Sequence, residues 1–216
     1  NKLYEQGKYA EAATAYEALI QHTPSSALYF NLGNAYFKKG EPGEAIACYL
    51  LARRLDPRDP DIRANLRFAR DSVGTRSPKA GRLDRWLALF TMNELTVASA
   101  VVVWLWFGLL ALAYIRRDWA KSLRSSQVLV GILAALMVIW QAVAMRQRIG
   151  AREAVVISKE AVIRYGPFEE AQSFYTLHAG SELVLLNRKG DWLNVSDSAS
   201  RAGWVQSRQV KVLPPG

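Results

Sequence analysis

The sequence contains few of the residue types on which most catalytic and metal sites depend. Its 216 residues include one cysteine, Cys48, and two histidines, His22 and His178. One cysteine forms no internal disulfide, and no spacing of Cys and His matches a metal site. No phosphate-binding glycine loop, nucleophile elbow or paired-carboxylate motif is present. The sequence therefore predicts a protein that is not an enzyme and uses no cofactor or metal. Solvated or capping histidines are expected, and the adjacent Glu169 and Glu170 are expected to be solvated in a loop.

Positive charge is in excess, and it is unevenly distributed. The chain has a formal net charge of +9. Residues 81–152 hold nine Lys or Arg against three Asp or Glu, whereas residues 153–216 are balanced. Broad basic surfaces are typical of nucleic-acid binding, but cations beside apolar segments meet lipid headgroups and set topology. The distribution therefore indicates a membrane lipid surface and argues against a nucleic-acid partner.

Two long apolar segments occupy the middle of the chain. Residues 95–115 contain no charge, and residues 127–145 contain none either. Each segment is long enough to cross about 30 Å of hydrocarbon as a helix. The pattern predicts a transmembrane hairpin over 93–149 with a basic loop at 116–126. A hairpin buried in a soluble protein is the alternative, but the flanking segments are too small to cover it. Gln141 is expected at a membrane interface, with helix pairing as the alternative.

The residues before the hairpin and the charges around it bear on its orientation. Residues 75–92 are predicted to be a linker followed by an interfacial amphipathic turn that contains Trp86, Leu87 and Phe90. The density of Lys and Arg favours a cytoplasmic 116–126 loop with both soluble modules on the other side, although cations also flank the spans. We therefore expect a protein of the inner membrane with two periplasmic modules.

The first 74 residues contain a pattern that recurs after 33 residues. It reads Tyr29-x2-Leu32-Gly33-x2-Tyr36, Ala45-x3-Tyr49, Ala52 and Pro57, and its second half also occurs as Gly7, Ala12-x3-Tyr16 and Pro24. Small residues allow helices to approach, and Gly and Pro end them. The spacing resembles the tetratricopeptide repeat, which implies antiparallel helix pairs over 1–74 closed by a capping helix after Asp59. The cap's Arg63, Arg67 and Arg70 are expected to form a solvated outer face.

The resemblance also implies a peptide groove on the concave face of the helix pairs. The candidate groove residues are Phe30, Asn34, Phe37, Lys38 and Asn65. In peptide-binding members of the family, an Asn at the position of Asn34 contacts the ligand backbone. The alternative is that Asn34 is only the polar residue that often follows the Leu-Gly pair.

Beyond about residue 153, the hydrophobic period changes to two. Short runs at 154–157, 182–186, 192–195 and 203–205 are separated by Gly, Asn, Asp and Ser, which is typical of strands and turns. With the turn at Gly190-Asp191 and the triplet Gly203-Trp204-Val205, the segment 153–213 resembles the bacterial SH3-like barrel. The resemblance implies a barrel that binds peptides or cell-wall fragments through aromatic side chains. The candidates are Tyr165, Phe168, Phe174, Tyr175 and Trp192, while Trp204 is expected in the core.

The predicted fold class is a multidomain membrane protein: all-α tetratricopeptide helix pairs, a two-helix transmembrane hairpin, and a small all-β SH3-like barrel. This order of modules resembles the BatE-type proteins of bacterial aerotolerance operons. The resemblance implies von Willebrand A-type membrane partners, a MoxR-type ATPase system, and a role in oxidative or envelope stress. The leading hypothesis is a non-enzymatic scaffold for protein partners. The alternative is a protein that binds or senses peptidoglycan through its barrel.

Overall fold

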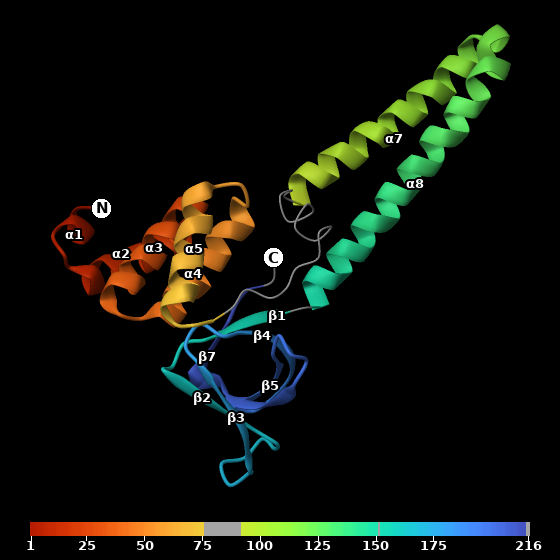
Figure 1. Cartoon of the computed structure of the whole chain (residues 1–216). Coiled ribbons are helices and arrows are strands. Elements are labelled where there is room, and N and C mark those ends of the chain that lie inside the picture. Colours follow the sequence, from red (N-terminus) through yellow and green to blue (C-terminus); the bar gives the residue numbers. More distant parts are fainter. Residues whose placement is uncertain (76–91, 151, 215–216) are drawn as a thin grey trace. The chain divides into compact units, whose positions relative to one another are not determined.

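The computed structural model of the chain describes residues 1–75, 92–150 and 152–214 (Figure 1). The chain divides into two compact units, one formed by Asn1–Leu89 with Ala151–Gly216 and the other by Phe90–Gly150. The predicted interfacial turn with Trp86, Leu87 and Phe90 lies outside the described residues. The predicted fold class is confirmed: helical repeats, two long apolar helices and a small antiparallel sheet follow one another.

The first unit begins with helices stacked in pairs (Figure 1). They are α1 (Lys2–Glu5), α2 (Tyr9–His22), α3 (Ser26–Lys39), α4 (Pro42–Leu55) and α5 (Pro60–Ser72). The predicted capping signal starts α5, because Asp59 Oδ1 accepts the backbone N–H groups of Asp61 at 2.8 Å and Ile62 at 3.1 Å. Gly40 ends α3 with a φ of 88°, a left-handed conformation that glycine adopts without strain. Local sequence signals therefore determine where α5 begins and where α3 ends.

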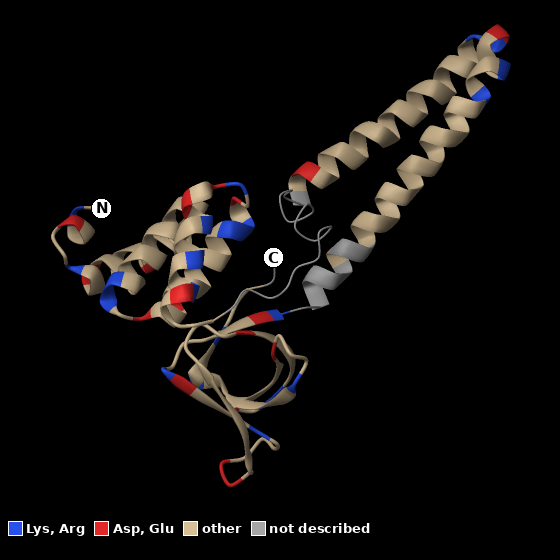
Figure 2. Cartoon of the chain, in the orientation of Figure 1, with Lys and Arg blue, Asp and Glu red and all other residues tan. Residues whose placement is uncertain are grey.

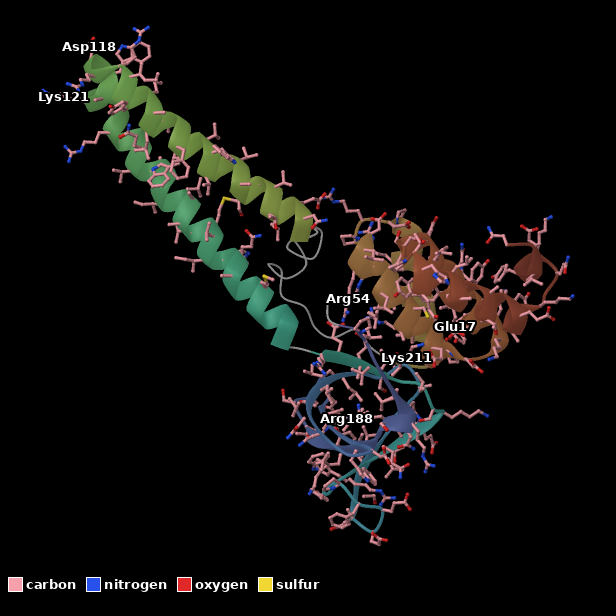
Figure 3. All side chains as sticks on the ribbon, turned by 180° about the vertical axis from the view of Figure 1, so that it is seen from behind. Glu17, Arg54, Asp118, Lys121, Arg188 and Lys211 are labelled. Carbon is pink, nitrogen blue, oxygen red and sulfur yellow. The ribbon has the colours of Figure 1, made fainter. Side chains whose placement is uncertain are left out.

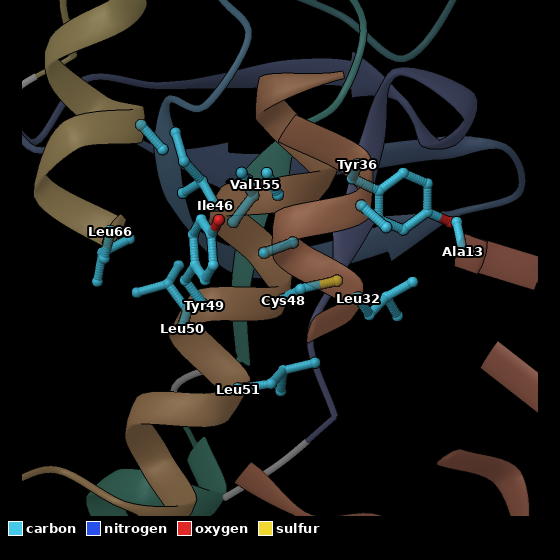
Figure 4. Packing of buried hydrophobic residues seen from close by; sticks show 14 of the residues in the cluster. Ala13, Leu32, Tyr36, Ile46, Cys48, Tyr49, Leu50, Leu51, Leu66 and Val155 are labelled. Atoms are coloured by element: carbon cyan, nitrogen blue, oxygen red, sulfur yellow. The ribbon is translucent and has the colours of Figure 1, made fainter. Parts of the chain in front are cut away.

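Small residues bring α3 and α4 together, as the repeat pattern predicts. A Cβ added to Gly33 would lie 2.6 Å from Cε1 of Tyr49, so the tyrosine ring packs directly on the glycine. Tyr36 and Ala45 belong with Tyr49 to one buried cluster, and Ala52 is fully buried as well. Figure 4 labels Tyr36 and Tyr49 in this cluster. The repeats are thus packed by tyrosine rings buried against glycine and alanine residues.

The second part of the first unit is a curved antiparallel sheet. Its strands are β1 (Arg152–Val156), β2 (Glu160–Arg164), β3 (Ser173–His178), β4 (Glu182–Lys189), β5 (Trp192–Ser196), β6 (Ala202–Gln206) and β7 (Val210–Val212), in the spatial order β3-β2-β6-β5-β4-β1-β7. A short 3-10 helix, η2 (Ser207–Gln209), precedes β7. Gly190, with a φ of 58°, makes the predicted turn between β4 and β5. The side chains of Ile163, Leu193, Val195 and Val205 meet inside the barrel.

The predicted core position of Trp204 is wrong. Gly203 and Val205 are buried, whereas Trp204 between them is half-buried and does not belong to the core cluster. Alternate residues of a strand face opposite sides of the sheet, so Trp204 lies on the outer face. Gly203 must be small because an added Cβ would lie 2.4 Å from Cγ2 of Ile163.

The repeats and the barrel share one hydrophobic core. Val155 on β1 and Leu213 after β7 belong to the same buried cluster as Ile46 and Cys48 on α4 (Figure 4). We call this contact the seam. The separate modules expected from the sequence are therefore parts of one folded unit, although their residues lie on either side of the hairpin in the chain.

Two glycines allow the close approach at the seam. A Cβ on Gly43 of α4 would lie 2.4 Å from the carbonyl oxygen of Val156 and 2.9 Å from Cα of Ile157. A Cβ on Gly180 before β4 would lie 2.4 Å from Cδ1 of Ile46. Because Gly43 faces backbone atoms, no side-chain rotation can make room for a larger residue there.

Ion pairs cross the seam. Arg70 on α5 pairs with Glu182 on β4, Arg54 pairs with Glu153 at 2.7 Å, and Lys211 pairs with Glu44 at 2.6 Å. Arg54 also donates to the carbonyl oxygen of Pro214 at 2.6 Å. Figure 3 labels Arg54 and Lys211 where repeats and barrel meet. The expected solvated face of α5 is thus wrong for Arg70, which is only 7% exposed, and right for Arg63 and Arg67, which are exposed.

The second unit is a pair of long helices. They are α7 (Met92–Ile115) and α8 (Ala120–Gly150), joined by the 3-10 helix η1 (Arg117–Trp119). Both are long and apolar enough to cross a membrane, and 6% of each apolar window is buried. Figure 2 shows Lys and Arg gathered at the turn between them. The expected loop at 116–126 is too long, because α8 already begins at Ala120; residues 120–126 contain no Gly or Pro to stop it.

Polar contacts join the two helices at both ends. Trp106 Nε1 donates to the carbonyl oxygen of Gln127 at 3.1 Å, and Gln127 Nε2 donates to that of Leu109 at 3.1 Å. Gln141 Nε2 donates to Oγ1 of Thr96 at 2.6 Å. This hydrogen bond supports the alternative role of Gln141 in helix pairing.

Candidate binding grooves

The first candidate groove lies on α3 and α5. The Tyr49 hydroxyl donates to Asn34 Oδ1 at 2.7 Å, and Asn65 Nδ2 donates to the same oxygen at 2.8 Å. The structure thus brings the two predicted asparagines together, and Tyr49 with them. The Asn34 carbonyl oxygen is used within the protein, and no hydrogen bond within the described residues uses the Asn34 amide N–H groups or the Asn65 side-chain oxygen. One donor beside one acceptor matches the hydrogen-bonding capacity of a peptide unit.

Aromatic rings lie near this amide pair. The Phe30 ring centroid is 5.9 Å from that of Tyr49, and the Phe37 centroid is 5.4 Å from that of Phe68. Phe68, which sequence reasoning missed, is 63% exposed. It lies three residues after Asn65 on α5, and this helical spacing was the available signal that both share a face. Lys38, the remaining predicted residue, is exposed and does not take part in these hydrogen bonds and ring contacts.

The second candidate groove is a hollow of about 280 Å³ at the barrel surface. It is lined by Val162, Arg164, Glu169, Trp192, Gln206, Arg208 and Gln209. Most of these residues come from β2, β5 and β6 or follow β6. Trp192 therefore lies where the sequence expects a binding surface, but its neighbours are mainly polar and cationic side chains that sequence reasoning did not select.

A chain of hydrogen bonds runs along this hollow. Arg208 Nε donates to Gln206 Oε1 at 2.8 Å, and Gln206 Nε2 donates to Glu169 Oε1 at 3.0 Å. Arg164 Nη1 donates to the carbonyl oxygen of Ala171 at 2.7 Å. Glu169 is exposed in its loop, as expected, and its carboxylate also joins the loop after β2 to β6 through this hydrogen bond. The network holds two guanidinium groups beside one indole ring.

The other four predicted barrel aromatics do not share that hollow. The ring centroids of Tyr165 and Phe174 are 4.5 Å apart, and those of Phe174 and Tyr175 are 4.9 Å apart. Phe168 packs on Gly166. No ring contact among the described side chains joins Trp192 to this group. The single aromatic groove expected from the sequence is thus divided into an aromatic cluster and a polar hollow.

Charged groups fix the edge of the aromatic cluster. The Arg201 guanidinium lies 4.0 Å from the Tyr175 ring centroid and pairs with Asp197 at 2.6 Å. Burial would raise the pKa of Asp197, but hydrogen bonds from Arg201 and Ala199 outweigh it and lower that pKa. Asp197 therefore stays ionised and holds the cation over the ring.

One buried polar atom on the outer sheet face has no partner. Within the described part of the chain, Asn194 Oδ1 is shielded from solvent and accepts no hydrogen bond. Asn194 is two residues from Trp192 on β5 and is paired with Trp204 on β6, so all three belong to one face of the sheet. A shielded acceptor without a donor is uncommon in folded proteins.

The described residues contain no group of three or more His, Cys, Asp or Glu that could hold a metal ion. His22 and His178 are both exposed and lie in different parts of the first unit. The two grooves can therefore act through hydrogen bonds, aromatic contacts and charge.

Comparison with known families supports both modules. A family model described as Tetratricopeptide repeat matches residues 1–60, and a model described as Bacterial SH3 domain matches residues 158–211. No curated protein matches the chain. Each family model covers about a quarter of the sequence, so the matches name its modules and not the whole protein. Both are interaction modules that are typically non-catalytic.

Proposed function

We propose that this protein is a non-enzymatic scaffold, anchored in a membrane, that holds protein partners in its repeat groove and on its barrel. The observation that carries the proposal is the seam: Gly43, Gly180 and a shared core fix the two candidate grooves on one folded body. Partners bound to both would then be held in one geometry, which raises the effective concentration of each for the other.

The membrane anchor is supported by the same observation. Helix α5 precedes the apolar hairpin and β1 follows it, yet Arg70 on α5 pairs with Glu182 on β4. A folded unit occupies one compartment, so any membrane crossings by the chain between its two parts must be even in number. Two helices of sufficient length, α7 and α8, meet this requirement. In this proposal the repeats occupy residues 1–74, the linker and interfacial segment 75–92, the transmembrane hairpin 93–149, and the barrel 153–213.

We further propose a periplasmic location for the first unit, with the turn at η1 in the cytoplasm. The cations at this turn favour that orientation (Figure 2). In a Cys48→Ala background, single cysteines replace the exposed Ser122 on α8 or Gln172 before β3. An impermeant thiol reagent should label the cysteine at 172, and not that at 122, in cells with a permeabilised outer membrane. The reverse pattern would overturn the orientation.

The finer setting comes from the BatE-type order of modules. We propose partners of the von Willebrand A and MoxR classes within a stress-related inner-membrane complex. The test is affinity capture from solubilised membranes with full-length Asn34→Ala plus Lys38→Ala. Gln21→Ala plus Lys8→Ala, exposed residues on and just before α2 that belong to neither candidate groove, is the matched control. Loss of partners only with the α3 pair supports the groove, and equal recovery with both pairs removes it from the proposal.

Peptidoglycan binding through the barrel is the second candidate function. The hollow with Trp192, Arg164 and Gln206 favours it, because an indole ring beside guanidinium and amide groups suits an amide-rich glycopeptide. The full chain in detergent should be tested on purified sacculi, since the barrel shares its core with the repeats. Gln206→Ala plus Arg208→Ala should lower retention, while Gln172→Ala plus Arg188→Ala should not. No retention of the unaltered chain at low salt would exclude this function.

A further inference from the structure

The turn end of helix α8 carries a hollow of mixed character. It has a volume of about 610 Å³ and is lined by Lys121, Arg124, Ser125, Val128, Leu129 and Ile132. The cations and the serine lie toward the turn, and the three aliphatic residues follow along the helix. Figure 3 labels Lys121 and Asp118 at the turn. Every lining residue comes from α8, at the spacings of three and four that place side chains on one helix face.

This face is distinct from the one that meets α7. Gln127, Gly131 and Ala134 form the pairing face: the Gln127 carbonyl accepts from Trp106, an added Cβ on Gly131 would lie 2.7 Å from Trp106 Nε1, and Ala134 is buried. On the hollow's side, Val128 and Leu129 are 56% and 69% exposed. Nothing in the described part of the second unit covers them.

The two cations of the hollow are not neutralised within the described residues of this unit. No described carboxylate forms an ion pair with Lys121 or Arg124, and Asp118 is the only acid between 116 and 126. Arg116, by contrast, lies over the Trp119 ring, with 5.8 Å between its Cζ and the ring centroid. The hollow therefore offers positive charge at one end and hydrocarbon-like surface at the other.

We propose that this hollow binds one anionic diacyl phospholipid. Its phosphate would meet Lys121, Arg124 and the Ser125 hydroxyl, and one acyl chain would lie along Val128, Leu129 and Ile132. Ile132 lies 11 positions after Lys121, which corresponds to about 16 Å along the helix at 1.5 Å per residue. That length is close to half of the roughly 30 Å hydrocarbon core, so headgroup and chain depths agree. The inference rests on the membrane anchoring proposed above.

The test is native mass spectrometry of the full chain in detergent, titrated with dioleoylphosphatidylglycerol or with dioleoylphosphatidylcholine. One phosphatidylglycerol should bind in preference to phosphatidylcholine. Lys121→Ala plus Arg124→Ala should weaken that binding roughly thirtyfold, at about fivefold per cation near a membrane surface. The matched control is Arg116→Ala plus Arg117→Ala, which removes the same charge from the same turn outside the hollow and should retain the lipid.

A second pair of variants tests the apolar end. Leu129→Ala plus Ile132→Ala should weaken phosphatidylglycerol without changing the preference over phosphatidylcholine, while Val97→Ala plus Val101→Ala on α7 should have no effect. Glycerol 3-phosphate, which has the charge but no chains, should not compete at equal concentration.

Each contrary result has a distinct meaning. If Lys121→Ala plus Arg124→Ala and Arg116→Ala plus Arg117→Ala weaken lipid binding equally, the attraction is diffuse and the site is overturned. Competition by glycerol 3-phosphate would replace it with a free phosphate site, and dimers that exclude lipid would assign the face to a second copy of the chain. Release of the protein from membranes by alkaline carbonate would instead overturn the anchor, a separate result.

Discussion

In the unit of repeats and barrel, Ile46 and Leu193 are 0% and 2% exposed, whereas in the hairpin unit Trp104 is 75% exposed. The first unit buries its large apolar side chains against one another, and the second presents them outward along both helices. The internal contacts differ accordingly. The seam combines a shared apolar core with ion pairs, while α7 and α8 meet through small residues and side-chain amides. The comparison teaches that one chain uses the burial of large apolar side chains for one contact, and small residues with amide hydrogen bonds for the other.

Cys48 provides a readout for the first unit. It is the only cysteine of the chain and is 1% exposed in the core beside the seam. Its reaction with a small thiol reagent in the full chain therefore reports how often this unit opens. When opening and closing are fast relative to labelling, each tenfold rise in rate corresponds to about 1.4 kcal/mol of lost stability.

The largest effect is expected from Gly43→Ala. The new Cβ would meet the backbone at Val156 and Ile157, so we expect the unit to lose about 3 kcal/mol and Cys48 labelling to accelerate about a hundredfold. Gly108→Ala on α7 is the control, because nothing lies within 4 Å of its Cβ position. Unchanged labelling with Gly43→Ala would mean that the repeats and barrel do not share a core.

Leu213→Ala should have the next largest effect. Leu213 is buried in the shared cluster near the chain end, so its truncation should cost about 2.5 kcal/mol. Its neighbour Val212 is exposed, and Val212→Ala should cost less than about 0.5 kcal/mol. Chemical denaturation of the full chain, followed by Cys48 labelling, measures both. Equal costs would contradict a specific role for the end of the chain.

Arg70→Ala should follow. It leaves the partly buried Glu182 carboxylate without its cation, at a cost of about 2 kcal/mol. Arg67→Ala, one turn earlier on the exposed side of α5, removes the same charge and should change stability by less than about 0.5 kcal/mol. If both variants label Cys48 at the same rate, the ion pair contributes nothing at the seam.

Alkaline pH should weaken the first unit. Burial raises the pKa of Cys48 to about 12 from an ordinary value of 9.0, so the folded state keeps this thiol protonated. The unfolded chain ionises this thiol above pH 9, whereas the folded chain does so only near pH 12. The free energy of unfolding is therefore unaffected by this thiol below pH 9 and falls as the pH rises toward 12, by about 1 kcal/mol at pH 10. Urea unfolding followed by circular dichroism at pH 8 and pH 10 measures the loss. Cys48→Ala should reduce the pH dependence, and an identical dependence in that variant would contradict the assignment.

The smallest effect is expected in the hairpin. Gln141→Leu removes the hydrogen bond to Thr96 and should weaken the pairing of α7 and α8 by about 0.6 kcal/mol. Cys48 labelling should not change. Hydrogen exchange of the amides around Thr96, measured on the protein in detergent, would detect the local change. A concurrent rise in Cys48 labelling would mean that the hairpin contributes to the stability of the first unit.

Local features of the fold were predictable from sequence, because each depends on neighbours in the chain. Asp59 caps α5 by accepting a backbone N–H two residues later, and Gly190 makes the turn between β4 and β5. Gly33 lies at a fixed spacing from Leu32 and Tyr36 within one helix. The sequence also indicated α7 and α8 by length and composition. The start of α8 is harder to predict, because polar residues such as those at 120–126 are typical of loops, whereas Lys121 and Arg124 are also good helix formers.

The seam was not predictable, since it joins residues far apart in the chain. Arg70 on an exposed helix face and Arg70 paired with Glu182 give the same sequence pattern. The barrel hollow was missed for a related reason. Aromatic residues were selected as binding candidates, but Arg164, Gln206 and Arg208 gather only when β2 and β6 lie side by side. The proposed roles of Asn34, Asn65 and Trp192 remain predictions that the capture experiments test.

The place of Val155 and Leu213 in the repeat core has a consequence for synthesis of the chain. The ribosome completes α5 about 140 residues before it releases Leu213, and at roughly 5–20 residues per second this delay is on the order of 10 s. During that time the core side of α4 has no barrel to cover it, while the intervening hairpin emerges. The repeats therefore cannot complete their core until the barrel strands have been synthesised. Formation of the shared core then requires that the chain segments before and after the hairpin lie in the same compartment.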